Sequence, residues 1–176
     1  MGYYKEELLN NEVIKDGYFA TGDIGEIDAE GFLKITDRKK EMFKTSGGKY
    51  IAPQLIENSM KQSRFIEQIM VIGDGQKMPA AFIQPNFDFL KAWAKIHQIE
   101  IGTSYAEICT NQKVIERIKE EIDKLNEKFG NWEKIKRFEL TPDVWSIEGG
   151  HLTPTMKLKR KIVMEKYQSL YKQIYG

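Results

Sequence analysis

The sequence has almost no cysteine, since Cys109 is the only one in 176 residues. A lone thiol excludes an internal disulfide, so we expect a reducing, cytoplasmic setting. Long apolar runs are also missing, because no stretch approaches the ~20 residues that a membrane-spanning helix needs. The first residues contain no apolar segment of the kind found in signal peptides. The sequence therefore gives no sign of secretion or of a transmembrane segment.

An excess of one charge is lacking as well. The chain has 27 basic and 26 acidic residues, which leaves a formal net charge of +1. This balance provides no whole-chain argument for binding nucleic acid or an acidic surface. The two histidines, His97 and His151, are too isolated to suggest a metal site. Apolar residues make up 41% and charged residues 30%, which favours a packed core over disorder.

Two turn clusters predict β-hairpins in the first third of the chain. The segment 18–36 places apolar residues on both sides of "DAEG", a turn that ends at Gly31. The next turn is "TSGG", where Gly47 and Gly48 can take positive φ without a Cβ penalty. We therefore expect one hairpin before residue 37 and a second one after it.

Apolar spacing predicts helices and further strands in the rest of the chain. Helices are expected over residues 53–63, 86–98 and 111–129, and strands over 68–73, 80–85 and 134–142. Pro53 fits the first turn of a helix, Asn86 or Asp88 can cap another, and Ser104 with Glu107 matches a capping box. One last helix should carry Leu158, Ile162, Tyr167, Leu170, Tyr171 and Ile174 on one face. Strands separated by helices in irregular order predict an α+β fold with a short mixed or antiparallel sheet.

Three charged residues near the first hairpin allow two interpretations each. Asp23 follows a Thr-Gly turn, where an aspartate usually bonds its own backbone, but it could also accept hydrogen bonds from the vicinal hydroxyls of a ribose. Asp37 and Arg38 belong to the charge run "DRKKE", which is typical of a solvated face. A short charged junction between two hairpins is also typical of a hinge.

Lysines accompany two of the predicted loops. Lys44 and Lys49 flank the "TSGG" turn, which does not match a phosphate-binding P-loop. It is either a plain hairpin turn or a turn whose glycines let a ligand pass close to the backbone. Lys157 follows the Thr/Pro loop "LTPTM" and lies at the start of the last helix, where an ammonium group can reach another surface.

One family resemblance accounts for these motifs together. The stretches "GYFATGDIGEID", "ITDRKKEMFKTSGGKYIAPQLIE" and "LTPTMKLKRK" resemble the C-terminal part of an AMP-forming acyl-CoA synthetase of the adenylate-forming superfamily. The two longer stretches are most similar to long-chain fatty acid–CoA ligases. The resemblance implies that residues 1–36 are the tail of a large adenylation domain and that residues 37–176 are a mobile C-terminal domain. It also implies that the chain is a fragment of a longer enzyme and inactive alone.

The resemblance also implies roles for single residues. Asp23 matches the aspartate that holds the ribose hydroxyls of the nucleotide, and Arg38 matches an arginine that also reaches the ribose. Asp37 matches the hinge of the family. Lys157 matches the lysine that serves adenylate formation. The family often has glycine before this lysine, where the present chain has Met156.

The second predicted hairpin receives a separate role. By the resemblance, Lys44, Gly47 and Gly48 face the active site in the thioester-forming pose, where the glycines let the pantetheine of CoA pass. The whole enzyme would convert fatty acid, ATP and CoA to acyl-CoA, AMP and pyrophosphate. Its Mg²⁺ would be bound mainly by the missing domain. The implied partners are the enzyme's own N-terminal domain and these substrates, without nucleic acid.

Two alternatives stay open at the level of sequence. The acyl-adenylate could pass to a carrier protein instead of CoA. The chain could instead be a non-catalytic module whose basic last segment contacts RNA or acidic lipid at the inner face of a membrane. The basic residues of that segment are Lys157, Lys159, Arg160, Lys161 and Lys166.

Overall fold

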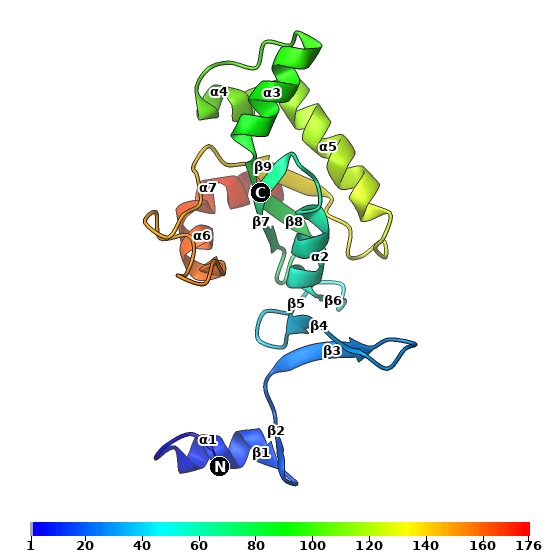
Figure 1. Ribbon diagram of the computed structural model, residues 1–176, viewed down its shortest axis with the longest axis vertical. Helices are drawn as coiled ribbons and strands as arrows, with labels where there is room; N and C mark the ends of the chain where they lie inside the picture. The colour runs from blue at the N-terminus through cyan, green and yellow to red at the C-terminus, as the bar shows by residue number, and fades with distance from the viewer. Residues whose placement is uncertain (1) are drawn as a thin grey trace.

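A three-stranded mixed sheet forms the centre of the protein in a computed structural model that describes residues 2–176 (Figure 1). Its strands are β7 (Ile66–Ile72), β8 (Ala80–Pro85) and β9 (Arg137–Leu140). The strand β8 pairs antiparallel with β7 and parallel with β9. All six residues of β8 are buried, so both faces of this central strand are covered. The predicted strand pair, the last strand and the α+β class are confirmed.

Alternate side chains of the sheet supply two separate cores. Successive residues of a strand point to opposite faces. Ile69 and Ile83 belong to the larger core, which also receives apolar side chains from the helices α2 (Pro53–Met60), α3 (Phe87–His97), α4 (Tyr105–Thr110) and α5 (Gln112–Asn126). Met70 and Phe82 belong to the smaller core on the other face, which α6 (Arg160–Lys166) and α7 (Gln168–Tyr175) help to form.

The helix starts follow the local chemistry of the sequence. Pro53 stands in the first turn of α2, and Asn86 caps α3 by accepting a hydrogen bond of 2.9 Å from the amide of Phe89. Ser104 and Glu107 form the reciprocal capping box at the start of α4. These predicted helix starts are confirmed, whereas α2 ends earlier than expected.

The prediction of one continuous last helix is wrong. The segment is divided at Tyr167, whose φ of −102° and ψ of 29° separate α6 from α7. The hydroxyl of Tyr167 donates to Asp143, and the indole Nε1 of Trp145 donates to that hydroxyl. The break lets Ile174 pack in the smaller core while Arg137 donates to the carbonyl of Ile174. Ile162, which the single-helix pattern places on the buried face, is 42% exposed.

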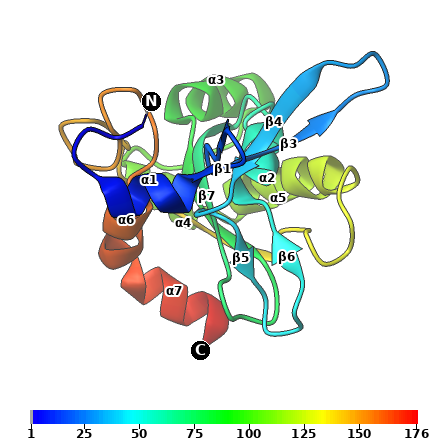
Figure 2. The same cartoon turned by 90° about the horizontal axis from the view of Figure 1, so that it is seen from below.

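Both predicted hairpins are present. The first consists of β3 (Asp23–Ile27) and β4 (Leu33–Arg38), and the second of β5 (Phe43–Lys44) and β6 (Tyr50–Ile51). The turn residues Gly31 and Gly48 have φ of +88° and +80°. Figure 2 shows that the two hairpins extend from the molecule in different directions.

The sequence pattern predicted no helix or strand in the first seventeen residues. The structure places a helix there, α1 (Glu7–Val13), followed by the short strands β1 (Ile14–Lys15) and β2 (Tyr18–Phe19). No residue of α1 is buried. Figure 1 shows this segment at the far end of the long axis, connected to the sheet and its helices through β3 and β4. Within residues 2–176, no helix is both long enough and apolar enough to cross a membrane.

Candidate functional site

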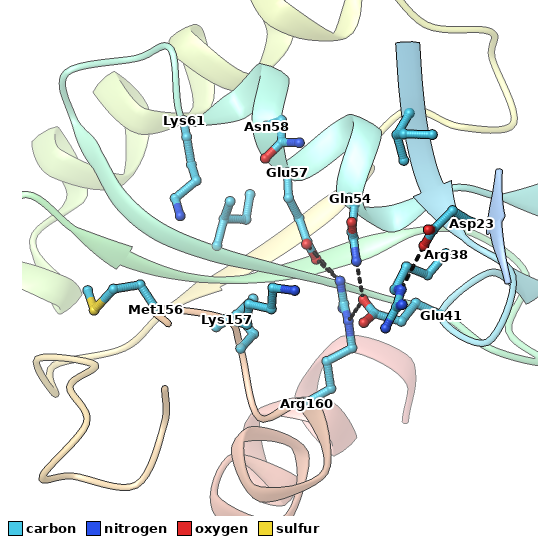
Figure 3. A pocket seen from close by; sticks show the side chains of 13 residues that line it. Asp23, Arg38, Glu41, Gln54, Glu57, Asn58, Lys61, Met156, Lys157 and Arg160 are labelled. Carbon is cyan, nitrogen blue, oxygen red and sulfur yellow. Dashed lines mark hydrogen bonds and ion pairs between the residues drawn. The ribbon is translucent and has the colours of Figure 1, made fainter. Parts of the chain in front are cut away.

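One pocket brings together three of the predicted site residues. Asp23, Arg38 and Lys157 come from distant parts of the sequence, and all line a cavity of about 440 Å³. The cavity lies between the β3–β4 hairpin, α2 and the loop that precedes α6, as Figure 3 shows in close view. Most of the residues that line the cavity are charged or carry a side-chain amide.

Asp23 and Arg38 form an ion pair on this wall. The antiparallel register of β3 and β4 places the two residues directly opposite each other, and Arg38 Nε donates to Asp23 Oδ1 at 2.9 Å. This hydrogen bond lowers the pKa of the Asp23 carboxyl, and the charge of Lys157 adds to the effect. The Asp23 amide also donates to the Thr21 hydroxyl. Asp23 is therefore a carboxylate at neutral pH, with acceptor capacity beyond this pair.

Asp37 is buried rather than solvated, so its interpretation as part of an exposed charge run is wrong. Its side chain is inaccessible to solvent and accepts hydrogen bonds from the amides of Arg38 at 2.6 Å and Gln54 at 3.1 Å. Gln54 lies in the first turn of α2, where helix amides lack intrahelical partners. Burial raises the pKa of Asp37. Asp37 thus attaches the end of β4 to the start of α2.

The loop that carries Lys157 is closed by short local bonds. Thr153 N–H donates to the Lys157 carbonyl at 2.8 Å, and Lys157 N–H donates to the Thr153 hydroxyl at 3.1 Å. Met156 has φ +61°, a left-handed conformation that side-chain-bearing residues adopt at a cost. Glycine would adopt this conformation without that cost.

An ion pair in the wall of the pocket was not predicted from the sequence. Arg160 Nη2 contacts both carboxylate oxygens of Glu57 at 2.8 and 2.7 Å, and Arg160 Nε donates to Glu41 Oε2 at 3.0 Å. Burial raises the pKa of Glu57, while Arg160 opposes that shift. One signal for this pair was present in the sequence. Glu57 directly follows Ile56 on the apolar face of the predicted helix, and an acidic residue buried on such a face requires a partner.

The other three predicted site residues lie elsewhere. Lys44, Gly47 and Gly48 belong to the β5–β6 hairpin, and none of them lines this pocket. The Lys44 ammonium stands 5.5 Å from the ring centre of Tyr50. Gly48 alone of the two glycines has positive φ, and a Cβ at either position would meet no atom closer than 3.7 Å. The structure thus separates Lys44 from Lys157 within one domain.

The charged groups of the described chain do not offer a metal site. Within residues 2–176, no cluster of three or more His, Cys, Asp or Glu side chains could hold a metal ion. The acidic groups Glu41 and Glu57, which line the pocket, already bind Arg160. These residues do not fit a resident Mg²⁺.

The basic last segment is partly neutralised. Arg160 pairs with Glu41 and Glu57, and Lys166 Nζ lies 3.3 Å from Asp143. Two of the five basic residues that suggested an RNA or lipid surface are therefore paired with carboxylates of the same chain, which weakens the alternative of a basic binding module.

Comparison with known proteins gives consistent matches over the chain. The family model described as "AMP-binding enzyme C-terminal domain" matches residues 41–176. The long-chain fatty acid–CoA ligase FadD15 of Mycobacterium tuberculosis is 36% identical over 175 residues, which are 99% of this chain and 29% of that protein. Human long-chain fatty acid–CoA ligase 1 is 38% identical over 179 residues, or 25% of its length. The chain thus spans between a quarter and a third of these relatives.

Solved structures share the fold. The adenylation domain of a carboxylate reductase from Mycobacterium chelonae aligns with a TM-score of 0.77 at 21% identity, over 98% of this chain and 25% of that one. The adenylation domain of a carboxylic acid reductase from Segniliparus rugosus, in complex with AMP and a co-purified carboxylic acid, aligns with a TM-score of 0.75 at 25% identity, over 98% of this chain and 26% of that one. With the family model covering most of its length, the chain belongs to the C-terminal domain family of AMP-binding enzymes, and its homologues are long-chain fatty acid–CoA ligases.

Proposed function

We propose that this chain is the C-terminal part of a long-chain fatty acid–CoA ligase. In this proposal residues 1–36 complete the large adenylation domain, and residues 37–176 form the domain that moves. The observation that carries the proposal is the pocket in which Lys157 faces the Asp23–Arg38 pair. Whole-chain similarity to long-chain ligases supports the choice of fatty acid and CoA as substrates.

The first half-reaction would use that pocket. The fatty acid carboxylate attacks the α-phosphorus of ATP, an acyl–phosphate bond forms, and pyrophosphate leaves with the electron pair of the broken P–O bond. Negative charge gathers on the phosphoryl oxygens, and the Lys157 ammonium is a compact charge that can stabilise it. Asp23 would accept hydrogen bonds from the ribose hydroxyls, and Arg38 would orient that carboxylate. Since no ligand set for Mg²⁺ exists on residues 2–176, no metal step is assigned to them.

The second half-reaction would use the other hairpin. The CoA thiolate attacks the acyl carbonyl, a thioester forms, and AMP leaves as the acyl–phosphate bond breaks. Lys44 would stand beside the approaching pantetheine, while the open space above Gly47 and Gly48 admits it. Lys157 and Lys44 lie on different elements, which supports two orientations of one domain about Asp37. Each half-reaction is thus assigned to its own lysine.

The decisive experiment measures both half-reactions in the enzyme that carries this chain behind its large domain. Lys157→Ala should slow acyl-adenylate formation roughly 10²–10³-fold, the usual effect of losing one charge-stabilising donor. Attack of CoA on supplied acyl-adenylate should stay near the wild-type rate. Lys44→Ala should give the reverse pattern.

The matched control is Lys161→Ala, which removes an exposed lysine four residues further along. It should leave both single-turnover rates unchanged. If Lys157→Ala and Lys44→Ala slow both steps equally, the two lysines do not serve separate orientations and the proposed mechanism fails. Acyl-adenylate formation that is not followed by consumption of added CoA would instead favour a carrier-protein acceptor.

A further inference from the structure

We propose that Arg160 is a positioning residue that attaches the Lys157 loop to the turn following the Asp37–Arg38 junction. It would thereby set where Lys157 stands relative to the Asp23–Arg38 pair. The inference rests on the proposed role of Lys157 in adenylate formation, and its structural part can be tested without that role. It adds to the site a residue that acts through the position of Lys157.

The guanidinium of Arg160 is held from three directions. Glu57 on α2 accepts two hydrogen bonds, Glu41 accepts one through Oε2, and the carbonyl of Val71 on β7 accepts another at 3.3 Å. The Arg160 side chain is only 23% exposed. Its planar fork suits several carboxylate acceptors at once, which a lysine could not contact together. Figure 3 shows Arg160 reaching from α6 toward α2 and the turn that holds Glu41.

The contact with Glu41 is the one that reaches the junction. The Glu41 amide donates to the Arg38 carbonyl at 2.9 Å, so this turn continues directly from the end of β4. Gln54 Nε2 donates to the same Glu41 oxygen at 2.7 Å, while the Gln54 amide donates to Asp37. A continuous set of hydrogen bonds therefore joins Asp37, Gln54, Glu41 and Arg160.

The hydrogen bonds of Arg160 hold the C-terminal end of the Lys157 loop in place. Arg160 is the first residue of α6, three positions after Lys157. Between them, the Lys159 amide donates to the His151 carbonyl at 2.8 Å, and Leu158 forms a β-bridge with Leu152. Movement of the turn after the junction would therefore carry the loop with it. Lys157 would keep its place on the domain while the domain changes orientation.

The charge of Arg160 is paired with carboxylates of the same chain, and its side chain lines the same cavity as Lys157. Two carboxylates, Glu41 and Glu57, neutralise it, and the guanidinium points toward α2 and the turn after β4 that carry them. A purely structural role is the competing explanation. The two carboxylates separate the explanations, because the Glu57 side chain is 7% exposed whereas that of Glu41 is 33% exposed.

Glu57 should mainly support folding, since removing a partner leaves a buried charge unpaired. Glu41 should mainly support positioning. The test therefore uses Glu41→Ala, which leaves the Arg160–Glu57 pair intact, together with Arg160→Lys and the control Lys161→Ala. Amide hydrogen exchange of this chain and thermal melting are measured first. Single-turnover adenylation and CoA attack follow in the full enzyme.

We expect Glu41→Ala to melt close to wild type and to exchange the amides of residues 156–159 about tenfold faster. The single-turnover rate of adenylate formation at saturating ATP should fall about tenfold, while the ATP concentration for half-maximal rate and the rate of the CoA step stay unchanged. Arg160→Lys should lie between Glu41→Ala and wild type, and Lys161→Ala should match wild type.

Three outcomes overturn the inference. They are unchanged loop exchange in Glu41→Ala, faster exchange with an unchanged adenylation rate, and equal slowing of both half-reactions. Failure of the proposed function is a distinct result, because then Lys157→Ala would itself leave adenylation unaffected. If adenylate formation is slow in Lys157→Ala but proceeds at the wild-type rate in Glu41→Ala, only the role of Arg160 is rejected.

Discussion

Residues 2–36 and residues 37–176 differ in where their apolar side chains lie. The first part exposes most of its large apolar residues, including Leu8 at 88%, Ile27 at 73% and Phe32 at 66%. Within the described chain, the first buried apolar residue is Ile51. The second part encloses its sheet between two cores. Both parts contain apolar patterning and hairpins, so pattern alone does not produce burial.

The difference teaches what each part needs from its surroundings. A two-stranded hairpin is marginally stable alone, and it requires a further surface over its apolar side chains. The β3–β4 hairpin has that pattern without a cover inside residues 2–176. Exposed contiguous apolar surface commonly marks a docking face. The proposal that residues 1–36 belong to a large adenylation domain supplies the missing cover.

The largest expected effect is in amide hydrogen exchange on either side of Asp37. Amides of β3, and those of β4 before Asp37, should exchange orders of magnitude faster than amides of β8. Local opening free energies range from near zero up to the global value, which is ~5–15 kcal/mol for typical domains. The buried strand β8 provides the internal reference in the same sample. Equal protection in β3 and β8 would show that the first part is as stable as the second.

A matched pair of substitutions sharpens the comparison next. Phe82 is fully buried in the central strand, whereas Phe32 is largely exposed at the hairpin turn. Phe82→Ala should lower the free energy of unfolding by about 3–5 kcal/mol through lost burial and a cavity. Phe32→Ala should change it by less than about 0.5 kcal/mol. Urea unfolding measures both, and a comparable loss from Phe32→Ala would mean that the hairpin packs against the body.

Features set by local chemistry could be predicted from the sequence. The positive φ at Gly48, the proline start of α2 and the capping box at Ser104 depend on neighbouring residues only, whereas the positive φ that was also expected at Gly47 is absent. Strands β7 and β8 were equally predictable because each is a short apolar run between turn signals. The α+β class followed from their order.

Features set by distant partners could not be predicted in this way. The break at Tyr167 depends on Asp143 and Trp145, which meet it only in the folded chain. The same holds for Arg160, whose sequence context reads as one more basic residue while its partners lie on α2 and in the turn after β4. Asp23 and Arg38 were assigned through family resemblance, and the strand register explains their pairing.

A pH experiment compares exposed carboxylates of the two parts. Glu107 accepts hydrogen bonds from the amides of Ser104 at 2.9 Å and Thr103 at 2.8 Å, which lower its pKa to about 2. Its folded pKa lies below the unfolded one, so its stabilisation is present above the ordinary value of 4.5 and is lost as pH falls toward 2.

Glu107→Gln should therefore weaken the fall of stability between about pH 5 and pH 2, because the depressed pKa is removed. Glu26 in the hairpin forms an exposed ion pair with Lys34 at 3.5 Å, and Glu26→Gln is the control. Thermal melting across this pH range should show a flatter profile for Glu107→Gln and a wild-type profile for Glu26→Gln. Identical profiles for both variants would contradict a functioning capping box at α4.

The smallest expected effect concerns two side-chain-bearing residues with positive φ, one in each part. Met156 has φ +61° in the Lys157 loop, and Asp16 has φ +52° in the turn between β1 and β2. Glycine at either position removes a left-handed penalty of ~1–2 kcal/mol but increases the entropy of the unfolded chain by ~0.4–1 kcal/mol. Met156→Gly should thus raise the free energy of unfolding by no more than about 1 kcal/mol, and Met156→Val should lower it because a β-branched residue fits this φ poorly.

Asp16→Gly should leave the main unfolding transition unchanged, since its turn lies outside both cores. Urea unfolding with core tryptophan fluorescence from Trp145 reports this transition, and a shift for Asp16→Gly as large as that for Met156→Gly would mean that the two parts unfold as one unit.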